Sequence, residues 1–276
     1  MIGQNGLLSR IDKLVEKGFP RFVLLVGQEG SGKKLLSKEI ANKLGFPLVP
    51  IGTGVDEVRE VIANSYRNTE PIVYVLADTD KMSVGAKNAL LKITEEPPQK
   101  AYFIMTVANT ANTLPTVLSR ACVLNLDPYT VEELTEYLQL KHDIKKLSED
   151  EIEFITRTCY VPKEVDTLMS YDLKEFKKYV ETICNSLHTV NAANCFKIEN
   201  KLALKKDEEK WDVLLTLQAI KSIYLNFLFY GDNKDLRYFD CYRCVTKTIT
   251  DIQTKNSVNK QYCLDQMILE IRKIWR

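Results

Sequence analysis

The chain has 276 residues, of which 45% are hydrophobic and 27% are charged, an ordinary composition for a soluble globular protein of more than one domain. Its net charge of +1 excludes a global field that would drive the whole molecule onto nucleic acid or an anionic membrane. No apolar stretch is predicted to span a bilayer, and seven cysteines with no export signal before them predict reduced thiols in the cytoplasm.

The first half of the chain alternates helices with short apolar strands. An amphipathic helix is predicted over residues 2–17, and a buried strand at 23–26 leads into a glycine-rich loop and a second helix. Further strands are predicted at 47–51, 71–76, 101–107 and 122–126, with helices around 55–62 and over 83–95. Strands that alternate with helices predict an α/β fold with a parallel sheet covered on both faces.

The pattern changes after Asp127, where no further strand is predicted. Three short helices are expected at 131–140, 148–158 and 162–170, the second with a capping box formed by Ser148 and Glu151. Longer helices are expected at 175–187, 193–204, 211–230, 236–250 and 258–275. The predicted division is therefore 1–127 for the α/β domain, 128–173 for a three-helix part and 174–276 for an all-α part.

The loop after the first strand has the pattern of a phosphate cradle. Glycines let successive backbone N–H groups converge on an anion, the following helix N-terminus favours negative charge, and a lysine reaches the terminal phosphates. An acidic residue at the end of the strand at 71–76 is typical of the opposite side of such a site. The predicted nucleotide-binding residues are Gly27, Gly30, Ser31, Gly32, Lys33, Lys34 and Asp78.

Two positions in this machinery are atypical. Lys34 stands where the motif needs a hydroxyl to ligand Mg²⁺, and an ammonium cannot coordinate a cation. Thr79 follows Asp78 where hydrolysing proteins of this architecture carry a glutamate that activates water, and losing a general base costs about 10²–10⁴-fold in rate. The sequence therefore predicts no metal ligand set and little or no ATP hydrolysis, although a nucleotide can still be held. The alternative for Asp78 and Asp80 is a solvated turn at a strand end.

Further motifs point to one family. Residues 88–98 read NALLKITEEPP and residues 114–120 read LPTVLSR. These motifs closely resemble the clamp-loader subunits of bacterial replicative polymerases, members of the AAA+ superfamily. With its altered phosphate loop and retained Ser119-Arg120, the chain looks most like the delta-prime type. The resemblance implies a AAA+ P-loop domain with a parallel sheet, a small helical lid and an all-α collar that serves oligomerisation.

The resemblance also implies roles that spacing alone does not give. Arg120, beside Ser119, would be an arginine finger acting in trans on the ATP site of an adjacent subunit. The partners would be the gamma/tau and delta subunits of the DNA polymerase III holoenzyme, the sliding clamp and primer–template DNA, which the helix at 83–95 would face. ATP or ADP would be bound weakly or not at all, Lys163 would lie near the nucleotide sensor of the lid, and the cysteine-free segment 45–56 predicts no zinc module.

Two other functions stay open on the sequence. The chain is alternatively an active AAA+ motor subunit of the gamma/tau kind, which would hydrolyse ATP when isolated, or a P-loop kinase for a small molecule, which would transfer phosphate to an acceptor. Cys241 and Cys244 form a lone CxxC pair in a helical segment, and they are interpreted as ordinary buried thiols.

Overall fold

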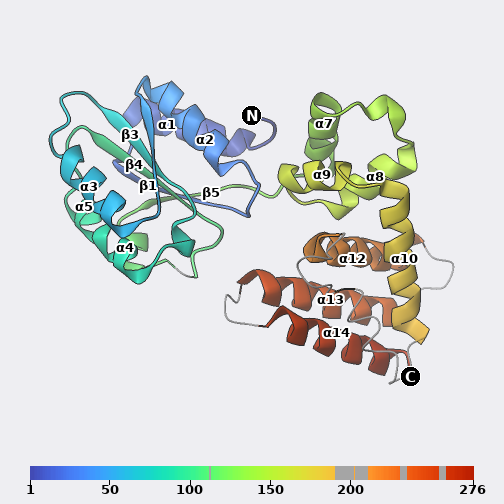
Figure 1. The fold of residues 1–276 in the computed structure, drawn as a ribbon. Helices are drawn as coiled ribbons and strands as arrows, with labels where there is room; N and C mark the ends of the chain where they lie inside the picture. The colour runs from blue at the N-terminus through green and yellow to red at the C-terminus, as the bar shows by residue number, and fades with distance from the viewer. Residues whose placement is uncertain (112, 190–201, 203–210, 231–234, 255–258) are drawn as a thin grey trace. The chain divides into compact units, whose positions relative to one another are not determined.

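The computed structural model describes residues 1–111, 113–189, 202, 211–230, 235–254 and 259–276 (Figure 1). The chain forms two compact units. The first comprises Met1–Glu133 together with Val161–Lys163, and the second comprises Leu134–Tyr160 and Glu164–Arg276. The division of the chain into three parts at 127 and 173 stays a prediction.

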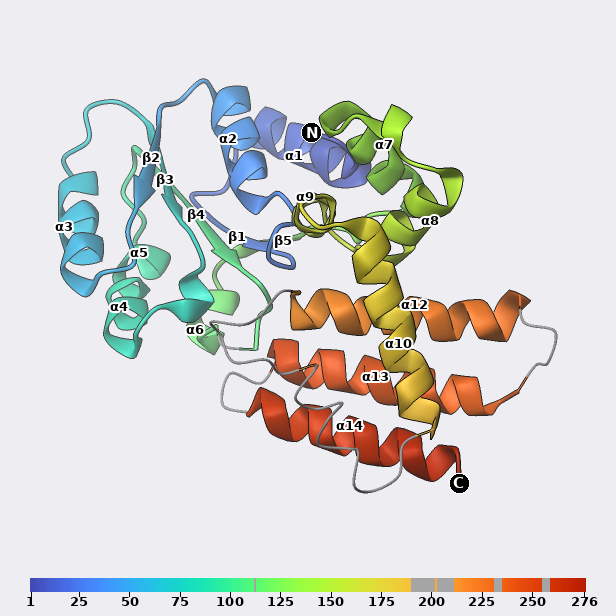
Figure 2. The same cartoon turned by 45° about the vertical axis from the view of Figure 1, so that its right-hand side comes forward.

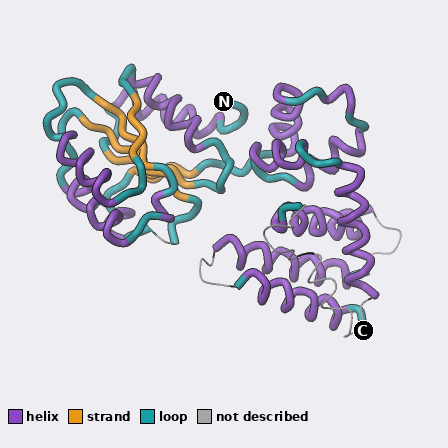
Figure 3. The backbone as a smooth tube through the Cα atoms, in the orientation of Figure 1, coloured by secondary structure: helices purple, strands orange, loops and turns teal. Residues whose placement is uncertain are grey.

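The first unit is built on five parallel strands in the order β2-β3-β4-β1-β5, drawn in orange in Figure 3. The strands are β1 (Phe22–Val26), β2 (Leu48–Ile51), β3 (Ile72–Leu76), β4 (Ala101–Val107) and β5 (Cys122–Asn125). Because all strands are parallel, the loops after β1, β3 and β4 emerge at one edge of the sheet. This topology brings the glycine-rich loop and the end of β3 to either side of the end of β4.

Successive strand residues pack on opposite faces of the sheet, as the period of two requires. One core cluster joins Val23 and Leu25 to helices α1 (Asn5–Lys17) and α2 (Lys33–Leu44). The other joins Leu24 to the helices α3 (Val55–Ser65), α4 (Val84–Ala89) and α5 (Leu91–Glu95). Figure 2 shows these two groups of helices on the two faces of the sheet, so the predicted α/β layering is confirmed.

The predicted helix at 83–95 is in fact two helices. Ser83 caps the first by accepting a hydrogen bond from the Ala86 N–H at 3.3 Å, as its position before an apolar run suggests. The Leu90 N–H then bonds the Lys87 carbonyl at 3.2 Å, three residues back, which tightens the backbone and separates α4 from α5. A short helix, α6 (Pro115–Leu118), was not predicted at all.

The described part of the second unit is helical. Its helices are α7 (Val131–Lys141, whose first turn belongs to the first unit), α8 (Glu149–Thr158), α9 (Pro162–Met169), α10 (Leu173–Thr189), α12 (Val213–Tyr230), α13 (Arg237–Thr254) and α14 (Lys260–Ile274). Short 3₁₀ turns lie at Thr79–Lys81 in the first unit and at Ile144–Lys146 in the second. The capping box of Ser148 and Glu151 is present at the start of α8. The helix predicted at 193–204 falls outside the described residues, except for Leu202.

Helix α12 is the most apolar of the described helices. Its 18 residues are long and apolar enough to cross a membrane by length and composition alone, whereas the sequence analysis predicted no such stretch. Within the structure, 44% of these residues are buried. It packs against α8, α10 and α13, and Leu217, Ile220 and Tyr224 of its predicted apolar face are fully buried. Core helices of helical bundles pass the same length and composition test.

Candidate nucleotide site

The glycine-rich loop joins β1 to α2 in a conformation that requires glycine. Gly30 and Gly32 have φ angles of 84° and 92°, which residues with a side chain rarely adopt. Gly32 is the N-cap of α2, and Lys33 is its first residue. The first backbone N–H groups of a helix have no partner within the helix, so this end of α2 presents donors to an anion.

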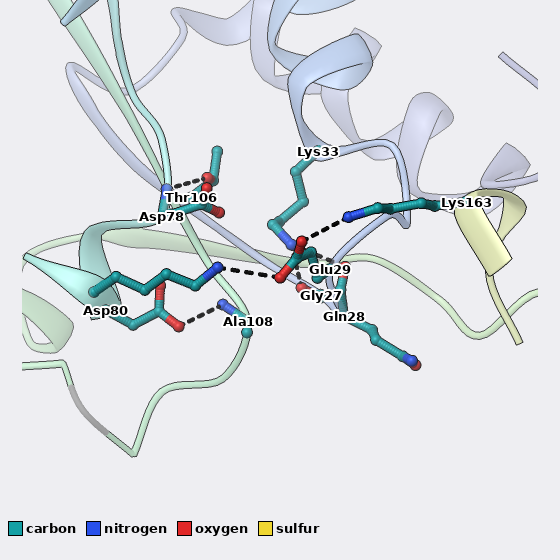
Figure 4. A network of polar contacts seen from close by, with 10 residues as sticks. Gly27, Gln28, Glu29, Lys33, Asp78, Asp80, Thr106, Ala108 and Lys163 are labelled. Atoms are coloured by element: carbon teal, nitrogen blue, oxygen red, sulfur yellow. Dashed lines mark hydrogen bonds and ion pairs between the residues drawn. The ribbon is translucent and has the colours of Figure 1, made fainter. Parts of the chain in front are cut away.

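The side chain of Lys33 turns back onto the loop, and only 6% of the residue's surface is exposed. Its Nζ donates to the carbonyl oxygens of Gly27 and Gln28, the latter at 2.9 Å (Figure 4). Burial lowers the pKa of Lys33, while the nearby carboxylates of Asp78 and Asp80 oppose that shift. The ammonium is therefore held by the loop's own carbonyl groups, within the cavity that a phosphate would enter.

The ends of β3 and β4 are joined by side-chain hydrogen bonds. Asp78 has a φ of 52°, and its N–H donates to Thr106 Oγ1 at 3.0 Å. Thr79 is buried, and its hydroxyl donates to the Thr106 carbonyl at 3.3 Å. Asp80 accepts a hydrogen bond from the Ala108 N–H at 3.3 Å. These contacts fix Asp78 opposite the glycine-rich loop.

These elements enclose a cavity of about 290 Å³. It is lined by Glu29, Gly30, Gly32, Lys33, Lys34, Asp78, Thr106 and Lys163. Most of the predicted binding residues therefore come together, and Lys163 joins them from the first turn of α9. Gly27 and Ser31 do not line the cavity. Their carbonyl groups support the loop: that of Gly27 accepts a hydrogen bond from Lys33 Nζ, and that of Ser31 accepts one from the Tyr129 hydroxyl at 3.0 Å.

The sequence reading did not identify Glu29 or Thr106 as residues of this cavity. The Glu29 carboxylate lies between two ammonium groups, 2.7 Å from Lys163 Nζ and 3.1 Å from Lys81 Nζ. Hydrogen bonds and charge from Lys163, and then from Lys81, lower the pKa of Glu29 to about 2. No motif or spacing marks Glu29, whereas Thr106 belongs to residues 106–109, where the family resemblance implies a sensor residue without fixing which one.

The residues present do not fit a magnesium ion. The position after Lys33 carries the exposed side chain of Lys34, which lines the cavity and places a cation where the motif needs a hydroxyl ligand. In the parts of the chain that the structure describes, no group of three or more histidine, cysteine, aspartate or glutamate side chains is arranged to hold a metal. Thr79 also offers no general base, because an alcohol hydroxyl does not accept a proton near neutral pH, and this one is buried and donates to the Thr106 carbonyl.

Arg120 and Ser119 do not line this cavity. They follow α6 on the surface, where Arg120 donates to the Thr116 carbonyl at 3.1 Å and lies 3.5 Å from the Glu95 carboxylate. The Arg120 side chain is 41% exposed, and the Ser119 hydroxyl donates to the same Thr116 carbonyl at 3.1 Å. The guanidinium is therefore available to a group outside this chain's own loop.

The CxxC pair lies on α13. Cys241 is buried and accepts a hydrogen bond from Trp275 Nε1 at 3.2 Å, and the Cys244 thiol, which is half-buried, donates to Glu270 at 3.5 Å. Burial raises the pKa of Cys241 to about 11 and that of Cys244 to about 12. Both are free thiols that stay protonated near neutral pH, which makes them poor metal ligands and poor nucleophiles.

Comparison with known proteins adds a family to this geometry. The family model described as DNA polymerase III, delta subunit, matches residues 53–130, a stretch that contains Asp78, Ser119 and Arg120. A delta' subunit of DNA polymerase III from Haemophilus influenzae is 34% identical over 96 residues, which are 33% of this chain and 29% of that protein.

Further relatives come from Buchnera aphidicola. A DNA polymerase III delta' subunit is 26% identical over 178 residues, covering 61% of this chain and 51% of that protein. A gamma subunit is 33% identical over 97 residues, covering 34% and 26% respectively. The chain thus spans between about a quarter and a half of the length of these curated relatives.

Solved structures share the fold. A DNA polymerase III gamma subunit-related protein from Thermotoga maritima matches with a TM-score of 0.50 at 18% identity, over 98% of this chain and all of that one. A RuvB variant from Thermotoga maritima matches with a TM-score of 0.52 at 17% identity, over 99% and 87%. Identities this low establish the fold alone, but the sequence relatives and the family model go further. Over residues 53–130 and the stretches aligned with these relatives, the chain is similar to subunits of bacterial DNA polymerase III.

Proposed function

We propose that this chain is a delta-prime-type, largely non-hydrolysing subunit of a DNA polymerase III clamp loader in the bacterial cytoplasm. Its proposed partners are gamma/tau and delta subunits, the sliding clamp and primer–template DNA, and its proposed task is to help place the clamp on primed DNA. The observation that carries the proposal is a phosphate loop that keeps its shape while Lys34 and Thr79 replace the groups that hydrolysis needs.

The chemistry of the cavity supports weak nucleotide binding without turnover. Lys33 and the N-terminus of α2 offer an anion site, which suits the phosphates of weakly bound ATP or ADP. Without a hydroxyl to ligand the metal and without a general base beside Asp78, neither the attacking water nor the leaving group is activated. The nucleotide would then act as a structural ligand.

The position of Arg120 supports a role in trans. A guanidinium is suited to γ-phosphate because it presents several donors in a planar fork. Arg120 is exposed, and its ion pair with Glu95 is also exposed, so releasing it costs little. A subunit that hydrolyses no ATP can in this way control hydrolysis on its neighbour.

The second candidate is an active motor subunit of the gamma/tau kind, which the similarity to a gamma subunit favours. The two hypotheses differ in the ATPase activity that they predict for the isolated chain. A delta-prime-type chain has negligible ATPase alone yet co-purifies with candidate gamma/tau and delta subunits, and it raises hydrolysis when they assemble. A motor subunit hydrolyses ATP when isolated, and Lys33→Ala abolishes that activity. ATPase measured alone and in the co-purified assembly decides between them.

A further inference from the structure

The glycine-rich loop carries a carboxylate, Glu29, in a cavity that is also lined by three lysines. Glu29 is two residues after Gly27, and it bridges Lys163 and Lys81 with contacts of 2.7 Å and 3.1 Å (Figure 4). Lys81 comes from the 3₁₀ turn after β3, and Lys163 comes from the first turn of α9, so the bridge joins three separate segments of the first unit.

The charges around the cavity explain what this carboxylate does. Lys33, Lys34 and Lys163 line the cavity, and among the lining residues only Glu29 and Asp78 carry negative charge. Clustered ammonium groups repel one another, so an anion that bridges Lys163 of this cluster to the neighbouring Lys81 offsets part of that repulsion when no ligand is bound. Two oxygens that accept from two ammonium groups also reproduce the contacts that the terminal oxygens of a phosphate would make.

Packing and charge keep the bridge in place. A Cβ atom added to Gly30 would lie 2.3 Å from the Cβ of Lys163, so the stem of this lysine rests directly on the loop. Because the pKa of Glu29 is lowered to about 2, the carboxylate stays ionised throughout the physiological range. Protonation therefore does not release the two lysines, whereas a competing anion can.

We propose that Glu29 is an internal counter-anion that determines the ligand affinity of this site: the phosphates of an incoming diphosphate or triphosphate displace it from Lys81 and Lys163, which then bind the ligand. The proposal rests on the phosphate-binding role proposed for the loop and not on the role in clamp loading. It concerns a polyphosphate without a bound divalent cation, since Lys34 leaves no ligand for the metal.

The size of the effect follows from the two ion pairs. All three side chains are about 60% exposed, and an exposed ion pair changes an equilibrium constant by about 1.4-fold to 5-fold. Two such pairs lost on binding together weaken it by roughly 2-fold to 30-fold. Glu29→Gln keeps the shape of the side chain while removing its charge, so it should tighten binding by a factor in that range.

The test is calorimetric titration of the full chain with inorganic pyrophosphate and with ADP, both in EDTA. Glu29→Gln is compared with wild type and with Glu16→Gln, which removes one exposed carboxylate from α1, outside the cavity. The expected result is tighter binding of both ligands by Glu29→Gln and an unchanged affinity for Glu16→Gln. Equal affinity in wild type and Glu29→Gln, or no binding to either, would overturn the proposal.

A double-mutant cycle separates displacement from simple repulsion. In a Lys81→Met, Lys163→Met background, displacement predicts that Glu29→Gln no longer tightens binding, because no bridge is left to break. Through-space repulsion by Glu29 predicts the same gain in both backgrounds, and that result would also overturn the proposal. These outcomes do not depend on ATPase in an assembled loader, so the clamp-loading role stands or falls separately.

Discussion

Replacing Arg120 by alanine in the assembled loader tests the arginine-finger proposal. Within its own chain, Arg120 makes one exposed ion pair with Glu95 and one hydrogen bond to the Thr116 carbonyl. Exposed ion pairs contribute about 0.2–1 kcal/mol, so Arg120→Ala should lower the free energy of unfolding by no more than about 1 kcal/mol. Assembly should therefore survive the substitution.

The effect on hydrolysis should be far larger than the effect on stability. An arginine finger contributes about 10³–10⁵-fold in rate, which corresponds to roughly 4–7 kcal/mol of barrier. Only the ATP site that Arg120 reaches loses activity. In an assembly with several ATP sites, the total hydrolysis rate therefore falls by the fraction that this one site contributes. A single-turnover count of ATP hydrolysed per complex resolves this share.

Arg59→Ala is the matched control, because Arg59 also makes one exposed ion pair, with Asp56 at 3.8 Å. It should leave the count unchanged, and Arg120→Lys should recover only part of the lost activity because a lysine lacks the planar fork. If complexes carrying Arg120→Ala hydrolyse the same number of ATP molecules at the same rate as wild type, the finger assignment is wrong.

Three further substitutions test the site and the fold. Lys34→Thr restores the hydroxyl of the phosphate-loop motif, so Mg²⁺ should tighten ATP binding in this variant but not in wild type; an equal response to Mg²⁺ would contradict the metal argument. Gly30→Ala places a methyl group against Lys163 at a φ of 84°, so its melting temperature should fall further than that of Gly18→Ala, which has a φ of 103° and no heavy atom within 4 Å of its added Cβ. Ser148→Ala removes the capping box of α8 and should cost about 1 kcal/mol in chemical denaturation, and a change below about 0.3 kcal/mol would show that the cap contributes little.

The layered fold of the first unit could be predicted from the sequence because its signals are local. Apolar runs such as residues 72–76 have the length and composition of buried strands, and their alternation with helices fixes a parallel sheet. The convergence of Lys33 and Asp78 follows from that sheet, since both come after parallel strands whose ends share one edge. The break at Leu90 could not be predicted, because no glycine or proline marks it.

The rest of the site depends on contacts that leave no trace in spacing. Glu29 and Lys163 are 134 residues apart, and an ion pair between two long side chains imposes no periodicity on either segment. Thr106 lies in an apolar strand, and its role at the cavity appears only when its hydroxyl is placed next to the Asp78 N–H. The sequence therefore predicted most of the residues that line the cavity, but not Glu29 or Thr106.

The proposed function requires that this chain keeps the architecture of an ATPase without its catalysis. The direct test is the steady-state ATPase of the purified, isolated chain with Mg²⁺, measured beside Lys33→Ala as the background. We expect wild type and Lys33→Ala to give the same negligible rate. Sustained Mg²⁺-dependent turnover by wild type that disappears in Lys33→Ala would contradict it.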